Sequence, residues 1–284
     1  MKKISVIIPA YNEEKSIQGT INGIKNNIKD IKYEIIVIND GSTDRTLEII
    51  KKIKGIKVIS HSTNKGYGAA IKTGLRNSRY DWICIIDADG TYPAEDIPKL
   101  LGYIPEYDMV IGARTKKGAK IPLARKPAKF FLKKLSEYLT KTKIPDLNSG
   151  LRIFKREIAE RFMNLFPDGF SFTTTLTIAC LTNDYRVKFV PINYYEREGE
   201  SSISAIRDFS GFLQLILRLT LYFNPLRVFI PVSLFLFLIG CVKIWIDFFN
   251  IGSFGLGGTI LILTSIQLAF LGLIADMIIK RTQL

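Results

Sequence analysis

The sequence has few of the residues that build covalent frameworks or nitrogen-ligated metal sites. It contains three cysteines and one histidine in 284 residues. Cys84, Cys180 and Cys241 lie in separate apolar stretches, which is typical of buried thiols in a reducing compartment and argues against a disulfide or zinc framework. His61 has no second histidine or cysteine nearby, so we expect a structural histidine at a strand end.

Acidic residues are also scarce. There are 26 of them against 40 lysines and arginines, which gives a formal net charge of +14 and favours an anionic partner such as nucleic acid, phosphate or a lipid surface. The excess is concentrated between Arg114 and Lys143, where eleven basic residues, Arg125 among them, accompany one acid, Glu137. A helix with one apolar and one basic face is predicted over 122–142, either lying in a membrane interface or packing on the domain.

We expect no signal peptide in the N-terminal stretch, because its apolar run is short and turns polar at once. Long apolar runs occur only in the last third, over 228–249 and 256–279. Each is long enough to span a bilayer core of about 30 Å as a helix. Basic flanks, "NPLR" before and "KRTQL" after, predict a multi-pass membrane hairpin with the N-terminal domain on the cytoplasmic face. The alternative is a soluble protein with two buried core helices.

The first part of the chain alternates between β-rich runs and helical patterns. Strands are predicted over 4–9, 34–39, 56–61, 82–87 and 109–113, and helices over 15–26, 44–54, 68–78 and 94–101. This alternation predicts an α/β fold with a mostly parallel sheet covered by helices on both faces, in which ligands bind at the carboxyl ends of the strands. We therefore expect an α/β domain that carries the ligand site over 1–200, an amphipathic interfacial helix over 201–225 and two transmembrane helices over 226–284.

An acid pair ends the fourth predicted strand in the stretch "ICIIDADGTYP". If the strand continues through Asp87, residues two apart point to the same face, so Asp87 and Asp89 lie together. Two like charges at a strand tip repel each other unless a cation lies between them. Carboxylate pairs suit hard divalent cations, so we predict that Asp87 and Asp89 hold Mg²⁺ or Mn²⁺ with help from a substrate diphosphate.

Two further polar clusters follow predicted strands. In "NDGSTDRT", Ser42 and Asp44 can cap the next helix, but Asp40 is not needed for capping and can accept hydrogen bonds from a base or a ribose. "PAYNEE" places Tyr11 and Glu13 beside it for the same nucleoside. In "NKGYGAAIKTG", two glycines at the head of a helix either let the backbone approach a ligand or mark a plain helix start.

Taken together, "SVIIPAYNEE", "VINDGSTDRT", "NKGYGAAI", "DADGTYPAEDI" and "DLNSGLRIF" resemble family 2 glycosyltransferases with the glycosyltransferase-A fold. The chain is most similar to the dolichol-phosphate mannosyltransferase and polyprenyl-phosphate glycosyltransferase type. The resemblance covers about residues 1–225, and the hairpin resembles the anchor of many members. It implies an inverting, metal-dependent hexosyltransferase that uses a nucleotide-diphosphate sugar and a polyprenyl or dolichyl phosphate.

The resemblance also implies individual roles. The residues that match nucleotide-sugar-binding positions are Pro9, Tyr11, Glu13, Asp40, Asp87 and Asp89. Asp89, Arg114 and Arg197 match catalytic positions. The acceptor phosphate is expected at Arg114, Arg125, Arg197 and Ser201, and Asp146–Arg152 is expected beside the transferred sugar. Mg²⁺ or Mn²⁺ is implied as cofactor, and nucleic acid is not expected as a partner.

Two departures from the family pattern bear on these roles. Thr91 stands where many relatives carry a glutamine ligand to the metal, and Ser201-Ser202 stands where Ser-Lys is common. The Gln-x-x-Arg-Trp motif of processive synthases is absent from the sequence, which argues against polymerisation. The alternatives are a transferase acting on a neutral lipid alcohol, which would require a general base, and a non-enzymatic membrane scaffold. The sequence leaves the sugar and the nucleotide base open.

Overall fold

A computed structural model of the chain describes residues 2–29, 31–115, 133–134, 136–138, 140–169, 171–195, 221–222, 224–253 and 255–282. The chain forms two compact units, Met1–Phe212 and Leu213–Leu284.

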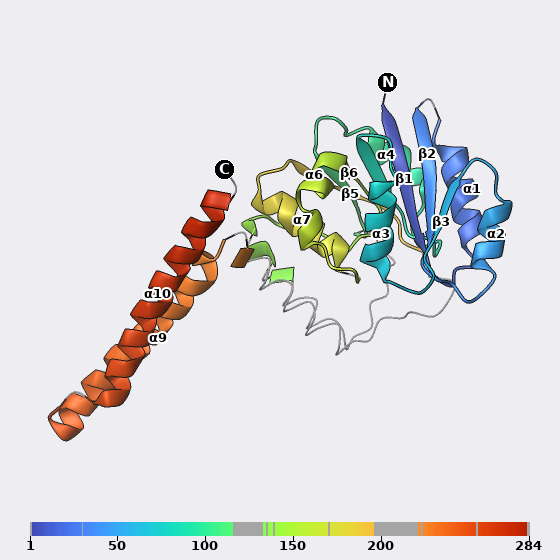
Figure 1. The fold of residues 1–284 in the computed structure, drawn as a ribbon. Helices are drawn as coiled ribbons and strands as arrows, with labels where there is room; N and C mark the ends of the chain where they lie inside the picture. The colour runs from blue at the N-terminus through green and yellow to red at the C-terminus, as the bar shows by residue number, and fades with distance from the viewer. Residues whose placement is uncertain are drawn as a thin grey trace. The chain divides into compact units, whose positions relative to one another are not determined.

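The first unit is built on a seven-stranded sheet in the order β3-β2-β1-β4-β6-β5-β7 (Figure 1). Neighbouring strands are parallel except at β6, which runs antiparallel to both β4 and β5. The strands are β1 Lys3–Ala10, β2 Lys32–Asn39, β3 Lys57–Ser60, β4 Trp82–Ile85, β5 Met109–Ala113, β6 Arg152–Lys155 and β7 Val187–Pro191.

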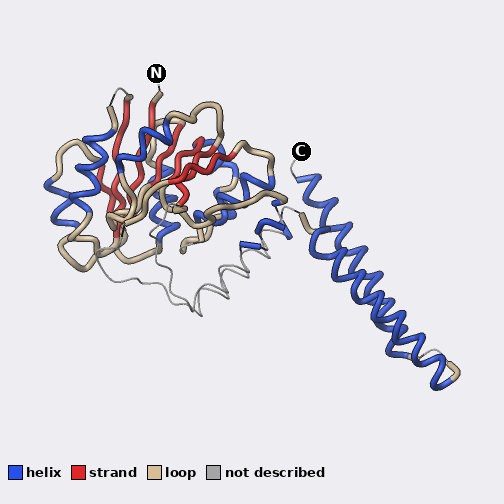
Figure 2. The backbone as a smooth tube through the Cα atoms, turned by 180° about the vertical axis from the view of Figure 1, so that it is seen from behind, coloured by secondary structure: helices blue, strands red, loops and turns tan. Residues whose placement is uncertain are grey.

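Helices cover both faces of this sheet, as Figure 2 shows from behind. They are α1 Ile17–Asn27, α2 Thr46–Lys52, α3 Tyr67–Arg76, α4 Ile97–Leu101, α6 Arg156–Arg161 and α7 Phe172–Thr182, with short 3₁₀ turns at η1 Ala94–Asp96 and η3 Met163–Leu165. Alternate residues of β1 face opposite ways, so Ile4, Val6 and Ile8 join the core with α1 and α4. On the other face, α3 comes so close that a Cβ on Gly74 would lie 2.5 Å from Ile7.

The predicted α/β architecture is confirmed, and the five predicted strands all form. β6 and β7 were not predicted. The prediction that a strand continues through Asp87 is wrong, because β4 ends at Ile85. Beyond Ile85, the residues that precede β6 do not continue the ladder, since the Gly150 N–H donates to the Tyr92 hydroxyl. Asp87 and Asp89 therefore lie in the turn that follows the strand, and strand alternation does not place them.

The second unit contains two long antiparallel helices, α9 Leu226–Ile251 and α10 Leu256–Thr282. Gly252 ends α9 in the left-handed conformation (φ +70°), which glycine adopts without steric cost. The helices approach closely where glycines meet, because a Cβ on Gly258 would lie 3.1 Å from the Gly240 carbonyl oxygen. The Ser233 hydroxyl also donates to the Ser265 carbonyl at 2.8 Å.

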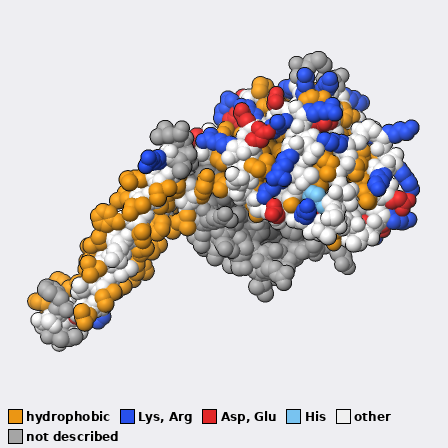
Figure 3. All heavy atoms as spheres, viewed as in Figure 1, with side chains coloured by type: hydrophobic (Ala, Val, Ile, Leu, Met, Phe, Trp, Pro, Cys, Tyr) orange, Lys and Arg blue, Asp and Glu red, His pale blue; other side chains and the backbone are white. Residues whose placement is uncertain are grey.

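The surface of these helices is apolar. Figure 3 shows hydrophobic side chains along their visible face. Both helices are long and apolar enough to cross a membrane, with mean hydropathies of 2.3 and 2.1. Of the 18-residue apolar stretch of each helix, only 6% in α9 and 11% in α10 is buried within the structure. The core helices of a soluble protein would be mostly buried. The pair therefore does not fit the alternative of two buried core helices.

Candidate active site

The acid pair lies just beyond β4, and each carboxylate accepts a hydrogen bond from a hydroxyl. The Tyr67 hydroxyl, from the start of α3, donates to Asp87 Oδ1 at 2.8 Å. The Thr91 hydroxyl and backbone N–H donate to Asp89 Oδ1 at 2.7 and 3.1 Å. Thr91 stands where many relatives carry a metal ligand. Here its hydroxyl hydrogen is donated to Asp89 and orients that carboxylate. Both carboxylates are partly buried.

The two carboxylates destabilise each other's charge. Burial, and then the charge of Asp89, raise the pKa of Asp87 to about 7. The bond from Tyr67 and the positive charges of Arg114 and Arg152 act in the opposite direction. A divalent cation between the acids would remove the repulsion, and carboxylate oxygens are ligands that Mg²⁺ and Mn²⁺ accept.

The protein supplies only part of a metal shell at this site. No group of three or more histidine, cysteine, aspartate or glutamate side chains suited to a metal occurs among the described residues. The acid pair fits a cation that takes its remaining ligands from water or a substrate. Asp89 also lines a cavity of about 360 Å³, which gives a ligand access to it. The other lining residues are Lys15, Ser16, Gly19, Thr20, Gly90 and Tyr195.

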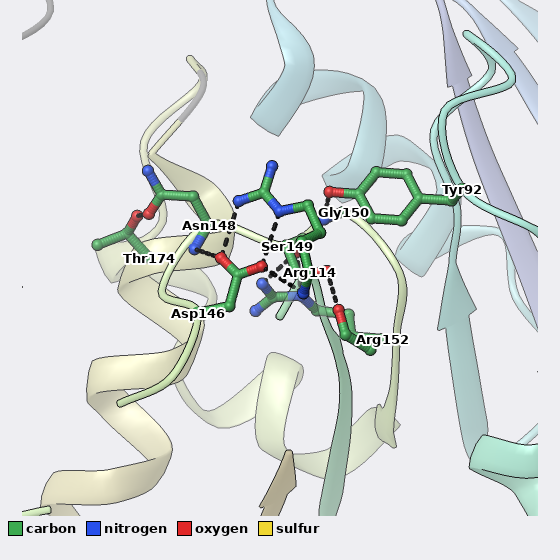
Figure 4. Close-up of polar contacts among 9 residues, drawn as sticks. Tyr92, Arg114, Asp146, Asn148, Ser149, Gly150, Arg152 and Thr174 are labelled. Atoms are coloured by element: carbon green, nitrogen blue, oxygen red, sulfur yellow. Dashed lines mark hydrogen bonds and ion pairs between the residues drawn. The ribbon is translucent and has the colours of Figure 1, made fainter. Parts of the chain in front are cut away.

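Gly150 closes the other side of Asp87. A Cβ at Gly150 would lie 2.1 Å from Asp87 Oδ2, so only glycine lets this backbone approach so closely. The Gly150 N–H is fixed by the Tyr92 hydroxyl at 2.7 Å (Figure 4). Ser149 is tied to the Gly112 carbonyl by its own hydroxyl at 2.5 Å. The segment 146–150 is therefore held rigidly against the acid pair.

Arg114 and Asp146 form a two-pronged ion pair in the same region. Arg114 Nε and Nη2 donate to the two carboxylate oxygens at 2.7 and 2.8 Å, and the Arg114 backbone N–H adds a bond of 3.0 Å. Burial alone would raise the pKa of Asp146, but the hydrogen bonds and charge of Arg114 outweigh it and hold that pKa below its usual value. The guanidinium also lies 5.2 Å from the centre of the Tyr194 ring. Figure 4 shows its other terminal nitrogen pointing away from Asp146.

Arg152 lies beneath this segment and is fully buried. Its Nε and Nη2 both donate to the Ser149 carbonyl, while Nη1 donates to the Thr173 carbonyl and the Thr177 hydroxyl on α7 at 2.8 and 3.1 Å. Arg152 thus joins the 146–150 segment to α7 and places a positive charge near Asp87.

The predicted nucleoside residues gather at the carboxyl ends of β1 and β2. Tyr11 is 39% exposed, whereas Asp40 is 3% and Glu13 8% exposed. Pro9 is buried within β1. Asp40 accepts hydrogen bonds from His61 Nδ1 at 2.6 Å and from the backbone N–H groups of Lys65 and Gly66 at 2.9 and 2.8 Å. Asp40 therefore braces the loop that leads into α3, and its predicted contact with a nucleoside stays a prediction.

The glycines at the head of α3 accommodate protein backbone in this structure. A Cβ on Gly68 would lie 2.1 Å from the Pro167 carbonyl oxygen, and one on Gly66 2.5 Å from that of Asp168. The first N–H groups of the helix donate to this loop, Gly68 to Gly169 at 3.2 Å and Ala69 to Asp168 at 3.0 Å. Both glycines in "NKGYGAAIKTG" are thus explained by the packing of the head of α3 against the loop 167–169.

Three predicted acceptor-site residues, Arg125, Arg197 and Ser201, lie outside the described residues. So does most of the helix predicted over 122–142, as well as the segment 201–220. Conversely, the sequence analysis gave no role to Tyr67 or Tyr92, and it did not pair Asp146 with Arg114. Their partners lie 20 to 58 residues away along the chain, and no local spacing marks such contacts.

Comparisons with known proteins identify the family and agree with the observed fold. The family model described as Glycosyl transferase family 2 matches residues 5–163, and the one described as GtrB C-terminal hairpin matches residues 224–280. A low-salt glycan biosynthesis hexosyltransferase of Haloferax volcanii is 32% identical over an alignment of 212 residues that covers 72% of this chain. The match spans about half of that relative, 51% of its length.

Another relative matches over most of its own length. The dolichyl-phosphate hexose transferase of Haloferax volcanii is 31% identical over 202 residues, covering 70% of this chain and 86% of that protein. Among solved structures, the Mycobacterium tuberculosis glucosyl-3-phosphoglycerate synthase in complex with Mn²⁺, uridine-diphosphate-glucose and phosphoglyceric acid is similar with a TM-score of 0.59. At 20% identity over 77% of this chain and 80% of that one, this likeness shows a shared glycosyltransferase-A fold.

Proposed function

Because the chain belongs to glycosyl transferase family 2, we propose that this glycosyltransferase moves a hexose from a nucleotide-diphosphate sugar to a polyprenyl phosphate. The observation that carries the proposal is the acid pair beyond β4, where Asp87 and Asp89 are each oriented by a hydroxyl and repel each other as anions. A non-enzymatic scaffold has no need of two charged groups held in this way.

Asp87 and Asp89 are the residues that would hold Mg²⁺ or Mn²⁺. When bound, the cation supplies positive charge beside the diphosphate as it leaves the sugar. The structurally similar glucosyl-3-phosphoglycerate synthase, solved with Mn²⁺ and uridine-diphosphate-glucose, supports a divalent ion in this fold. In this proposal Tyr11, which is exposed whereas Glu13 and Asp40 are buried, would contact the nucleoside.

Arg114 adds a fixed positive charge to the site. Its pairing with Asp146 uses Nε and Nη2, so the guanidinium plane is set before any ligand arrives. We assign the terminal nitrogen that points away from Asp146 to a phosphate oxygen of the donor or the acceptor. A rigid guanidinium stabilises charge there without reorganisation.

The acceptor explains why no histidine base is required. A phosphate monoester oxygen is already ionised near neutral pH, so it attacks the anomeric carbon directly when it is oriented. Direct attack by one nucleophile inverts the configuration at that carbon. A neutral lipid alcohol would instead have to lose a proton to a base.

The hairpin places the reaction at a membrane in this proposal. Arg227 lies at the start of α9 and Lys280 and Arg281 at the end of α10, so the basic residues share one end of the antiparallel pair. This asymmetry favours insertion with that end, and the catalytic domain, on the cytoplasmic side.

The test uses membranes that contain the full chain. They are incubated with labelled uridine- and guanosine-diphosphate sugars and polyprenyl phosphate, with EDTA and with EDTA followed by excess Mn²⁺ or Mg²⁺. We expect a lipid-phosphate-linked sugar that disappears with EDTA and returns with metal. Label in diacylglycerol or ceramide would overturn the proposed acceptor, and full activity in EDTA would overturn the metal.

A further inference from the structure

The proposed function does not use Tyr67, although this residue reaches the acid pair from a different element. Tyr67 is the first residue of α3, and its hydroxyl donates to Asp87 Oδ1 at 2.8 Å. In this contact the phenol O–H donates and the carboxylate oxygen accepts.

The backbone beneath Tyr67 is fixed from two sides. On one side, the buried Asp40 carboxylate accepts the N–H groups of Lys65 and Gly66, the two residues that precede the tyrosine. His61 holds Asp40 in turn, and its Nε2 lies 2.9 Å from the Thr73 hydroxyl on α3. The start of α3 is thus tied to the end of β2 by a buried network.

On the other side, the loop 167–169 packs directly on the glycines that flank Tyr67. Gly66 has a φ of +99° and its Cβ position lies 2.5 Å from the Asp168 carbonyl oxygen, so neither the conformation nor the space admits another residue. Lys72 also pairs with the Asp168 carboxylate at 2.8 Å. Tyr67 consequently has little freedom to move away from Asp87.

Asp87 lies between this hydroxyl and the backbone of Gly150. The tyrosine fixes Oδ1, while the Gly150 Cβ position is 2.1 Å from Oδ2. Rotation of the carboxylate would break the bond on one side or bring an oxygen closer to the backbone on the other. The Thr91 hydroxyl donates to Oδ1 of Asp89 in the same manner, so a hydroxyl orients each acid.

We propose that Tyr67 is a positioning residue that sets the orientation of the Asp87 carboxylate toward a divalent cation shared with Asp89. The proposal rests on the cation of the proposed function. Hydrogen-bond partners of metal ligands typically change metal affinity by about 10- to 100-fold when they are removed. A phenylalanine at this position keeps the ring and deletes only the donor.

The test titrates Mn²⁺ calorimetrically into the purified full chain in detergent, in the presence of uridine or guanosine diphosphate. Tyr67→Phe should weaken Mn²⁺ binding by about 10-fold or more and raise the Mn²⁺ concentration for half-maximal transfer by a similar factor. The KM for polyprenyl phosphate, measured at saturating Mn²⁺, should stay within about twofold. Unchanged Mn²⁺ affinity in a folded Tyr67→Phe protein would overturn the role.

Two comparisons separate this proposal from the proposed function. Tyr185→Phe removes a hydroxyl that bonds Arg161 at 3.1 Å, outside the site, and should leave Mn²⁺ binding unchanged. Asp89→Asn should lose Mn²⁺ binding. If Asp89→Asn binds Mn²⁺ like the parent, the metal site itself is wrong; if it loses binding while Tyr67→Phe does not, only the role of Tyr67 is wrong. If Tyr67→Phe lowers the melting temperature but leaves Mn²⁺ affinity intact, Tyr67 is structural and the proposal also fails.

Discussion

The acid site and the helical hairpin differ in the kind of side chain that they bury. Around Asp87, charged side chains are buried or partly buried and are held by hydrogen bonds, as in the pairs Arg114–Asp146 and Asp40–His61. Along the hairpin, apolar side chains face outward, and glycines bring the helices together. Side-chain orientation is therefore critical in the first region, whereas close packing dominates in the second.

The largest expected effect comes from removing one acid of the pair. Asp89→Asn keeps the side-chain shape and an acceptor for Thr91 but removes the charge that holds the cation. We expect transfer of labelled sugar to fall by about 10³-fold, because loss of charge stabilisation at a reacting centre commonly costs about 10²–10³ in rate. The melting temperature should change little.

The matched control for this variant lies at the other end of the same strand. Asp81 is exposed and directly precedes β4, so Asp81→Asn makes the same chemical change away from the site. It should transfer sugar at the parent rate. Parent-like transfer by Asp89→Asn would show that the pair has no part in the reaction.

A second variant tests orientation without touching charge. Gly150→Ala places a methyl group where the Asp87 carboxylate now lies. The obstructing atoms belong to the end of a side chain, so the carboxylate should rotate away while the fold persists. We expect a loss of about 10²-fold in kcat/KM, since displacements of about 1 Å in a catalytic site have effects of that size.

Gly169→Ala is the control for this change, because an added Cβ at Gly169 meets nothing within 4 Å. Kinetics of both variants should be measured with a polyprenyl phosphate acceptor, together with melting curves. If Gly150→Ala retains parent activity, close contact with Gly150 does not matter for the orientation of Asp87.

The third prediction concerns pH and the metal-free protein. The pKa of Asp87 rises from 3.8 to about 7 on folding, so the folded state binds a proton that the unfolded state has released between those values. The contribution of this group to stability is therefore greatest at low pH, falls as pH rises toward 7, and is constant above it. Asp87→Asn, which cannot ionise, should lose this dependence.

Melting temperatures in EDTA at pH 5.5 and pH 8 check this sign. Relative to the parent chain, Asp87→Asn should be more stable at pH 8 than at pH 5.5. Added Mn²⁺ at pH 8 should stabilise the parent chain more than the variant. An identical pH dependence in both proteins would contradict the raised pKa of Asp87 in the folded state.

Local patterns in the sequence predicted most strands and helices of the α/β domain but not the hydrogen bonds within the candidate active site. The β1, β2 and β4 runs of isoleucine and valine are continuous because both faces of a parallel sheet are covered, and such runs are readable. β6 and β7, "RIFK" and "VKFVP", mix charged and apolar residues and are only four and five residues long. Helix α7 is buried on almost all sides, so it shows no polar face to mark it.

The site residues divide in the same way. Asp87, Asp89 and Asp40 follow strands, and that position makes them visible in the sequence. Tyr67 and Thr91 act through hydrogen bonds whose partners depend on how loops pack, which no spacing records. Because β4 ends at Ile85, the turn after it, and not strand alternation, brings the charge of Asp89 within range of Asp87. Their joint role as metal ligands stays a prediction.

The smallest expected effect is in the hairpin, where a single hydroxyl should matter little. Ser233→Ala deletes the bond from Ser233 to the Ser265 carbonyl. Polar contacts between membrane helices average about 0.6 kcal/mol, so unfolding of the hairpin should shift by about that amount. The fluorescence of Trp245 on α9 reports this unfolding in a Trp82→Phe background, because the chain has only two tryptophans.

Gly240→Val provides the contrast within the same hairpin. A Cβ there would already lie 2.8 Å from Ile262 and 3.2 Å from the Gly258 carbonyl oxygen, so the larger side chain must push the helices apart. It should destabilise the hairpin by about 1–3 kcal/mol, the usual range for overpacking. If Ser233→Ala has the larger effect of the two, hydrogen bonding and not close packing holds the helices together, and the contrast between the hairpin and the acid site disappears.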